Sequence, residues 1–332
     1  MLLSSIKQTQ VITNKYIYYS IMLFMIFIAG GRTINVGIDT DAYLEIYNDI
    51  RKNGYLLYLE PTWNYLNIFA NWLGLSFNGF LILISFLTLY PIFYLSRKLS
   101  INHYLPIFIY FALHIFGASL NVMRQYMTIS YILVIYYSFS KRQWIWVIIW
   151  SVIIISIHKS NILLIPILFI LKYINITSLK WIGIGLLGTY ILGCVVNDSF
   201  FAFFIMDYSS YIDKGLYRDS SIMATIFSCI VGIFSFWLYT LIPKYKRNTI
   251  WCKIFILSLF ILLLTFRLEY GARIYILCSI SQLFFIPYLI KTQSTIKEGD
   301  FKLIIYSYYS VVFIRMWLLN ANGIMPYHNV WL

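Results

Sequence analysis

The sequence predicts an all-α protein that crosses a membrane many times, on the strength of its composition and of its apolar segments. Of the 332 residues, 61% are apolar and only 11% are charged, whereas a soluble domain carries about 25% charged residues. Apolar segments recur from one end of the chain to the other, and each is continuous rather than alternating as in a membrane β-barrel. The composition excludes a soluble enzyme, a nucleic-acid-binding protein and a disordered chain.

Eleven of these segments are predicted to cross the membrane, within a single transmembrane domain over residues 1–332. Residues 144–171 could form one long span, but basic residues stand at both ends, and the positive-inside rule places both ends in the cytoplasm. We therefore expect two short spans there. The first segment resembles a signal peptide, and we interpret it as an uncleaved anchor. The predicted spans are 16–31, 77–96, 103–119, 122–140, 143–157, 160–172, 181–196, 222–243, 250–266, 273–290 and 303–319.

Charged residues divide unevenly between the two sides of this topology. With the N-terminus in the cytoplasm, the inner segments carry fifteen basic and two acidic residues, so the whole net charge of +13 lies inside. The outer side carries ten residues of each sign. This distribution agrees with the positive-inside rule and explains the basic balance without a nucleic-acid partner.

Arginine is concentrated on the predicted outer side. Twelve of the fifteen inner basic residues are lysine, whereas seven of the ten outer ones are arginine. A guanidinium group binds phosphate or carboxylate through two parallel hydrogen bonds. We interpret the outer arginines as an anion site, with salt bridges to outer acids as the alternative, for example between Glu269 and Arg273. The outer arginines are Arg32, Arg51, Arg124, Arg218, Arg267, Arg273 and Arg315.

The polar residues that could carry chemistry lie mainly in two predicted outer segments. Residues 32–76 form the longer one, in which apolar residues follow helical spacing after Asp39 and Pro61 fits the first turn of a second helix. Residues 197–221 form an outer loop rich in tyrosine and charge. Because the inner segments are short and basic, we expect an active-site cavity on the outer face.

Neither a metal nor a disulfide is predicted. The four cysteines lie within apolar segments and form no CxxC motif, which is typical of buried residues. Asp39-Thr40-Asp41 has the form D-x-D, but we interpret Asp39 as a helix cap and site residue rather than a metal ligand. The sequence indicates no cofactor.

Several short motifs in a fixed order resemble one family. Their order and spacing resemble the EpsG-type and Wzy-type polysaccharide polymerases of bacterial inner membranes, over most of the chain. Two departures are Gly37-Ile38-Asp39 in place of Gly-Thr-Asp, and Lys159 after the histidine. The motifs are Arg32 with Gly37-x-Asp39-x-Asp41-x-Tyr43, then Glu60-Pro61, Met123-Arg124-Gln125 and His158-x-Ser160.

The resemblance implies an enzyme that joins oligosaccharide repeat units carried on polyprenyl diphosphate. The growing chain would pass from its lipid diphosphate to the sugar of a new unit, at the outer face of the bacterial inner membrane. The implied partners are the lipid-linked oligosaccharides, a flippase and a chain-length regulator. The resemblance leaves open whether the product is O-antigen, capsule or exopolysaccharide. The charge distribution predicts a cytoplasmic N-terminus and an outer C-terminus for this multi-pass protein.

For that reaction the outer residues divide by role. A sugar hydroxyl is a weak nucleophile, so a base is useful, and we predict Asp39 and His158 as the catalytic candidates. Histidine suits this role because its unperturbed pKa is about 6.5. The predicted diphosphate-binding residues are Arg32, Arg124, Arg267 and Arg273. The predicted sugar-binding residues are Asp41, Tyr43, Glu60, Gln125, Tyr208 and Tyr211.

Proteins of other classes also combine several spans with charged residues at membrane depth. A transporter or flippase is the main alternative, although such proteins often contain two matching halves, which this sequence lacks. An O-antigen ligase and a polytopic acyltransferase are alternatives among enzymes. The long acidic and aromatic segment at 32–76 favours the polymerase over these classes.

The predicted topology can be tested with reporter fusions. We expect fusions after Lys141, Lys246 and Lys297 to report the cytoplasm, because these residues belong to the basic inner segments. Fusions near Asn53 and Tyr327 should report the outer side, as should fusions within 197–221. A cytoplasmic result for 197–221 would contradict the topology.

Overall fold

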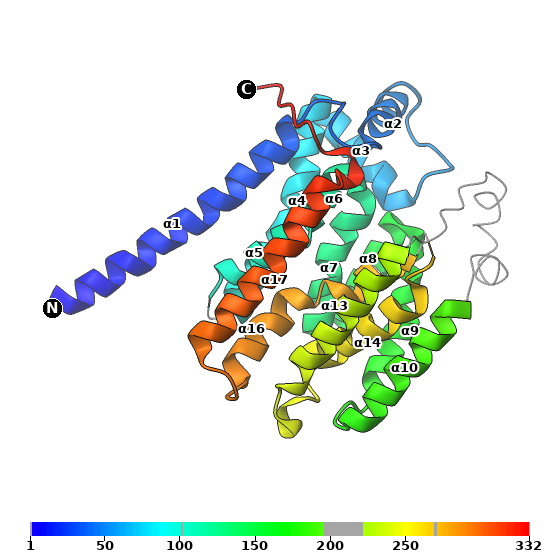
Figure 1. Cartoon of the computed structure of the whole chain (residues 1–332). Coiled ribbons are helices and arrows are strands. Elements are labelled where there is room, and N and C mark those ends of the chain that lie inside the picture. Colours follow the sequence, from blue (N-terminus) through cyan, green and yellow to red (C-terminus); the bar gives the residue numbers. More distant parts are fainter. Residues whose placement is uncertain (1, 101, 196–221, 269–270, 332) are drawn as a thin grey trace. The chain divides into compact units, whose positions relative to one another are not determined.

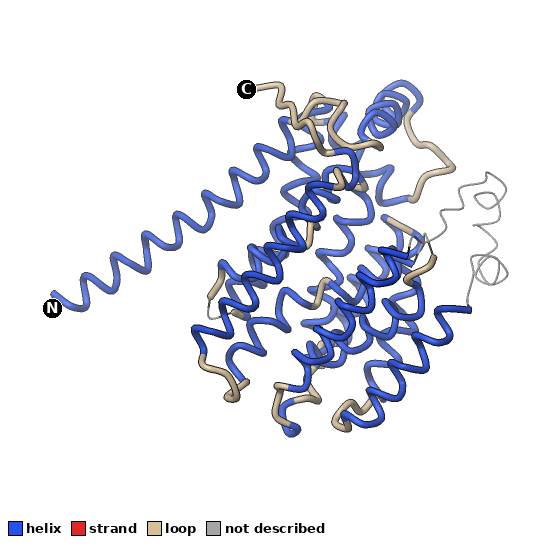
Figure 2. The backbone as a smooth tube through the Cα atoms, viewed as in Figure 1, coloured by secondary structure: helices blue, strands red, loops and turns tan. Residues whose placement is uncertain are grey.

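The structure is a computed structural model of the chain, and it describes all residues except 1, 101, 196–221, 269–270 and 332 (Figure 1). The described chain is built from helices joined by short loops, which confirms the all-α class (Figure 2). The predicted outer loop at 197–221, with Tyr208 and Tyr211, lies outside the described residues, and so does Glu269.

The chain forms two compact units, of which unit 1 comprises Met1–Ile162 and Ile305–Leu332. Within unit 1, α1 packs against α4, α4 against α7, and α7 against α8. The short helices α2 and α3 follow α1 and pack against each other. The elements are α1 (Leu2–Gly31), α2 (Thr40–Asn53), α3 (Pro61–Trp72), α4 (Phe77–Leu99), α5 (Tyr104–Ala112), α6 (Ile115–Asn121), α7 (Met123–Ser140), α8 (Trp144–Ile157), η1 (Lys159–Leu163), α17 (Glu298–Leu318) and η4 (Ala321–Gly323).

The local sequence explains where α3 and α4 begin. Pro61 occupies the first turn of α3, where its missing N–H group would have no partner in any case. The Ser76 hydroxyl accepts a hydrogen bond from the Gly79 N–H group at 3.2 Å and caps α4. The two helices predicted in the 32–76 segment are present in the structure as α2 and α3.

An aromatic layer joins α2, α3 and α4 in unit 1. The Trp63 ring lies 5.7 Å from Tyr43 and 5.6 Å from Phe80, and Tyr47 stacks on Phe80 at 5.1 Å. The Tyr47 hydroxyl donates to the Leu75 carbonyl at 2.7 Å, which ties α2 to the turn before α4. Because Trp63 and Tyr47 are at most 1% exposed, this layer fixes the position of α3 and of Glu60 beside it.

The predicted span 103–119 is a pair of helices rather than one. α5 and α6 meet at His114, and their axes differ by 58°. His114 has a φ of +58°, in the left-handed region that interrupts a helix. Its ring packs on Gly117, where a Cβ atom would lie 2.4 Å from His114 Cε1. His114 is 9% exposed and therefore belongs to the buried interior of unit 1.

Unit 2 comprises Leu163–Ile304 and is organised around α14. α14 packs against α9, α10, α13, α15 and α16, and Phe255 of α14 stacks on Phe285 of α16 at 3.7 Å. The elements are α9 (Leu164–Tyr173), α10 (Leu179–Val195), α13 (Ile222–Thr240), η3 (Lys244–Lys246), α14 (Ile250–Thr265), α15 (Gly271–Ser279) and α16 (Gln282–Thr292).

Arg247 shows that an inner basic residue of unit 2 does more than orient a helix. Its guanidinium donates to the carbonyls of Ile242 at 2.8 Å, Thr177 at 3.2 Å and Thr240 at 3.1 Å. Thr240 is the last residue of α13 and Ile242 follows it, and carbonyls at the end of a helix lack helical hydrogen-bond partners. Arg247 therefore joins two loops of the unit and is only 8% exposed.

Three helical segments are apolar and long enough to cross a membrane: Phe77–Leu99, Arg273–Thr292 and Glu298–Leu318. The bent pair α5 and α6 would make a fourth span. Shorter apolar helices of 10–17 residues include α8, α10 and α14, against about 20 residues for a full crossing. The count of eleven spans therefore stays a prediction, although helices occupy each predicted segment.

Two glycines of unit 1 offer a matched test of the loop before α2. Gly37 and Gly54 have φ of +89° and +76°, and a Cβ atom on Gly37 would lie 3.0 Å from the Leu120 carbonyl oxygen. Nothing lies within 4 Å of a Cβ atom on Gly54. Alanine at positive φ costs about 1–2 kcal/mol, so we expect both variants to lose thermal stability and Gly37→Ala to lose more. Equal melting temperatures in detergent would contradict the close approach at Gly37.

Candidate active site around Glu60

Glu60 holds together three segments of unit 1. One carboxylate oxygen, Oε2, accepts a hydrogen bond from Arg124 Nη1 at 2.7 Å. The other, Oε1, lies 3.8 Å from His158 Nδ1 and accepts from the Lys159 backbone N–H group at 3.5 Å. Glu60 precedes α3, Arg124 lies in the first turn of α7, and His158 follows α8. The predicted residues Glu60, Arg124 and His158 therefore meet in one cluster.

The electrostatics of this cluster keep Glu60 ionised. Burial by itself raises the pKa of the Glu60 carboxyl, but interaction with His158 and the positive charge of Arg124 outweigh burial and lower the pKa to about 2. Glu60 is 8% exposed, so its charge depends on these partners rather than on water. The cluster thus contains a fixed carboxylate at neutral pH.

Arg124 has donor groups beyond the one that binds Glu60. Its guanidinium carbon lies 6.0 Å from the centre of the Tyr43 ring, which is a cation–π distance. Its Nε group has no hydrogen-bond partner among the described residues. The side chain is 26% exposed, so Arg124 can reach an anion while it stays anchored to Glu60.

His158 carries two ring nitrogens without a hydrogen bond in the described part of the chain. The Nδ1 atom faces Glu60 Oε1, at a distance that a small ring rotation would convert into a hydrogen bond. A carboxylate on that side favours the tautomer with hydrogen on Nδ1, and Nε2 then carries a lone pair. Both ring nitrogens are buried, although 17% of the side chain is exposed, so Nε2 can act as a base only where a hydroxyl group reaches into the cluster.

Asp39 lies at the start of α2 and is tied to the turn before α7. Its backbone N–H group donates to Asn121 Oδ1 at 2.7 Å. It occupies the N-cap position of α2, but its carboxylate makes no capping hydrogen bond. The predicted capping hydrogen bond is therefore wrong, because the Asp39 backbone has helical φ and ψ of −90° and −2° instead of the extended conformation of a capping residue.

Arg32 is buried rather than presented on the surface. It is 1% exposed, and its guanidinium donates to the Ala29 carbonyl oxygen and, at 2.9 Å, to Met123 Sδ. Burial lowers the pKa of Arg32 to about 10, so it remains a cation at neutral pH. Its predicted role in diphosphate binding stays a prediction, and it would require the guanidinium to be uncovered.

The C-terminal tail pairs with the backbone on both sides of Arg32. The Thr33 N–H group donates to the His328 carbonyl at 3.0 Å, and the Val330 N–H group donates to the Gly31 carbonyl at 2.7 Å. The tail therefore lies against the C-terminal end of α1 (Figure 1). Sequence reasoning missed this contact, since both segments are short and carry no motif that pairs them.

The remaining predicted site residues are distributed over both units. In unit 1, Asp41 is exposed in the first turn of α2, and Gln125 is 4% exposed in the first turn of α7. In unit 2, Arg267 is exposed and donates to the Cys194 carbonyl at 2.6 Å, while Arg273 is exposed on α15. Their predicted roles stay predictions.

Asn121 is the residue of this region that the sequence-based prediction did not assign. Besides the hydrogen bond to Asp39, its Nδ2 group donates to Asn322 Oδ1 at 3.5 Å. It thereby connects the loop before α2, the end of α6 and the C-terminal tail. In the sequence, only its position in the same turn as Arg124 indicated that Asn121 could belong to the site.

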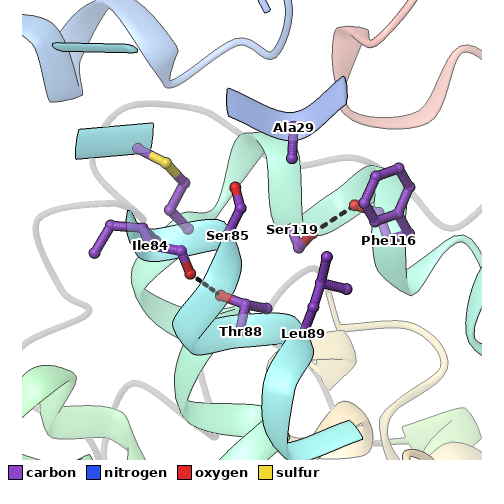
Figure 3. A pocket seen from close by; sticks show the side chains of 8 residues that line it. Ala29, Ile84, Ser85, Thr88, Leu89, Phe116 and Ser119 are labelled. Carbon is purple, nitrogen blue, oxygen red and sulfur yellow. Dashed lines mark hydrogen bonds between the residues drawn. The ribbon is translucent and has the colours of Figure 1, made fainter. Parts of the chain in front are cut away.

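A small polar cavity lies beside this region, between α1, α4, α6 and α7 (Figure 3). Its volume of about 10 Å³ is enough for one water molecule but not for a sugar. The Ser85, Thr88 and Ser119 hydroxyls line it, and each donates to a carbonyl of its own helix, which leaves them as acceptors. This cavity is not the predicted active-site cavity, which stays a prediction.

Comparison with known proteins places the chain in a family. A model of the EpsG family matches residues 15–329, which cover nearly the whole chain and both units. The chain belongs to the EpsG family. No curated protein and no solved structure matches it significantly. Membership of the EpsG family indicates a role of the polysaccharide-polymerase type, and together with the apolar helices it indicates a membrane protein.

The charge of Glu60 gives this EpsG family member a testable pH dependence. Because the pKa is lowered from 4.5 to about 2, the carboxylate stabilises the fold above pH 4.5, and this stabilisation is lost as the pH falls towards 2. We expect Glu60→Gln to cost about 2 kcal/mol at pH 7. The difference from the wild type should shrink below pH 4.5, as measured by thermal unfolding in detergent.

The matched control is Glu45→Gln, since Glu45 is exposed on α2. This variant should melt like the wild type at both pH values. If Glu60→Gln also melted like the wild type at pH 7, the ion pair with Arg124 would contribute nothing to the fold.

Proposed function

We propose that the protein joins oligosaccharide repeat units carried on polyprenyl diphosphate, at the outer face of the bacterial inner membrane. One observation supports this most directly. In a chain of the EpsG family, the cluster of Glu60, Arg124 and His158 combines a cation suited to a diphosphate with an imidazole suited to a sugar hydroxyl. The enzyme would be a glycosyltransferase that uses a lipid-diphosphate donor.

The reaction forms one glycosidic bond and breaks one bond to diphosphate. The acceptor hydroxyl oxygen attacks the anomeric carbon of the growing chain, and the bond from that carbon to the diphosphate oxygen breaks. The electron pair leaves with the lipid diphosphate. His158 takes the hydroxyl proton on Nε2, and the charge of Glu60 stabilises the resulting imidazolium. Asp39 is the alternative base.

The leaving diphosphate carries the charge that must be stabilised. Arg124 serves this purpose because its guanidinium is fixed on Glu60 while 26% of its side chain stays exposed. Arg32, Arg267 and Arg273 complete the proposed diphosphate-binding set. Arginine binds a diphosphate better than lysine does, because its planar guanidinium can bind two phosphate oxygens at once.

The sugar units would contact polar and aromatic side chains near the same cluster. Tyr43 lies directly against Arg124, and its position is fixed by Trp63. Asp41, Glu60 and Gln125 belong to the same proposed set, and Tyr208 and Tyr211, which lie outside the described residues, are included on the sequence alone. A flippase would supply the lipid-linked units, and a chain-length regulator is the further proposed partner. We propose no cofactor.

A strain that lacks the gene tests the function and the site together. We expect the deletion strain to display a single repeat unit on its lipid anchor, and a plasmid copy of the wild type to restore the polymer, as seen on a glycan gel. Asp39→Asn, His158→Ala and Arg124→Lys should each abolish or strongly reduce the polymer. A general base contributes about 10²–10⁴-fold in rate, and lysine does not reproduce the arginine fork.

Arg51→Lys is the matched control for Arg124→Lys, since Arg51 is exposed in the last turn of α2. It should restore the polymer fully. Immunoblots of membranes must show equal protein for all variants. Normal polymer from a variant would remove that residue from the mechanism, and loss of all surface glycan from the deletion strain would point to a transporter or another enzyme.

A further inference from the structure

Helix α3 presents an uncharged aromatic face on the surface of unit 1. Tyr65, Phe69 and Trp72 are 62%, 46% and 77% exposed, and their spacing places them on one side of the helix. The opposite side is buried, with Trp63 and Ala70 at 0% exposure. The buried side also holds Asn64 and Asn67 at 0% exposure, so α3 turns its amide side chains inward and aromatic rings outward.

The charge pattern separates this face from its neighbour α2. Between Lys52 and Arg97 the sequence contains a single charged residue, Glu60, and that residue is buried. α2 packs against α3 but exposes charges, among them Asp41 and Glu45. Two adjacent helices thus present surfaces suited to different surroundings: α2 suits water, and α3 suits an apolar medium.

The aromatic face continues into adjoining segments. Leu57 and Tyr58, in the loop before α3, are 93% and 67% exposed. On the other side, α3 leads through Gly74, at a φ of +69°, directly into α4. α4 is one of the segments long and apolar enough to span a membrane. The exposed face of α3 therefore lies next in sequence to the point where a spanning helix begins.

We propose that the aromatic face of α3 lies in the lipid headgroup region of the membrane leaflet at which α4 begins. Tyrosine and tryptophan are enriched in this region because their rings are apolar and their N–H or O–H groups are polar. An interfacial helix buries its apolar face by about 5–10 Å at the boundary of headgroups and acyl chains. Tyr65, Phe69 and Trp72 supply such a face without any charge to desolvate.

This placement sets the depth of the Glu60 cluster. Glu60 precedes the first turn of α3, so an interfacial α3 holds Glu60 and its partner Arg124 close to headgroup level. The diphosphate of a lipid-linked sugar lies at the same level. This consequence rests on the proposed function, whereas the insertion of α3 does not depend on it.

Photo-crosslinking to lipid tests the insertion in the full-length protein. We would place p-benzoylphenylalanine at position 65 or 72 and reconstitute the protein in nanodiscs of phosphatidylethanolamine and phosphatidylglycerol that contain a clickable phospholipid. Position 86 is the positive control, since Phe86 is 42% exposed in the middle of α4. Position 48 is the matched negative control, since Asn48 is exposed on α2.

We expect lipid adducts at positions 65 and 72 comparable to those at position 86 and several-fold above those at position 48. Absence of lipid adducts at 65 and 72, with normal adducts at 86, would overturn the proposal. Crosslinks to a second copy of the protein in place of lipid would also overturn it. Because lipid adducts are measured whatever the activity, failure of the polymerase proposal would leave this result unaffected.

Discussion

The carboxylate of Glu60 is the contact on which the candidate site depends. It joins α3 to Arg124, which is 64 residues away in sequence, and to Lys159, which is 99 residues away. Removal of this charge would leave the Arg124 guanidinium without its counter-ion, and because 26% of that side chain is exposed, the cost is about 2 kcal/mol, as for a hydrogen bond to a charged group. The same carboxylate lies 3.8 Å from His158 Nδ1, so one residue contacts the arginine and faces the histidine proposed as the base.

The surroundings of Glu60 explain why its position is well defined. The aromatic layer of Tyr43, Tyr47, Trp63 and Phe80 fixes α2 and α3 on α4. Aromatic contacts of this kind restrict both the distance and the rotation of the helices, because flat rings pack well in few orientations. The polar cluster and the aromatic layer thus stabilise each other, although the residues of each come from separate segments of the sequence.

The two faces of α3 connect the site to the membrane. The buried face carries Trp63 into the aromatic layer, and the exposed face carries Tyr65 and Trp72 to the surface. An enzyme that acts on a lipid-linked substrate needs its reactive groups at a defined depth, and a helix anchored on both faces provides it. In this arrangement one short helix determines both where Glu60 lies within the protein and how far it lies from the lipid.

The sequence by itself determined the helical class, the family resemblance and the start of α3 at Pro61, because composition, motif order and first-turn proline are local properties. It also indicated the residues of the cluster, but not their contacts. Only the tertiary structure decided that Glu60 meets Arg124 and His158, that the Asp39 backbone is tied to Asn121, and that the C-terminal tail pairs with the backbone beside Arg32. These outcomes depend on which distant segments pack together, and that packing is decided by side-chain shape and burial rather than by any local pattern.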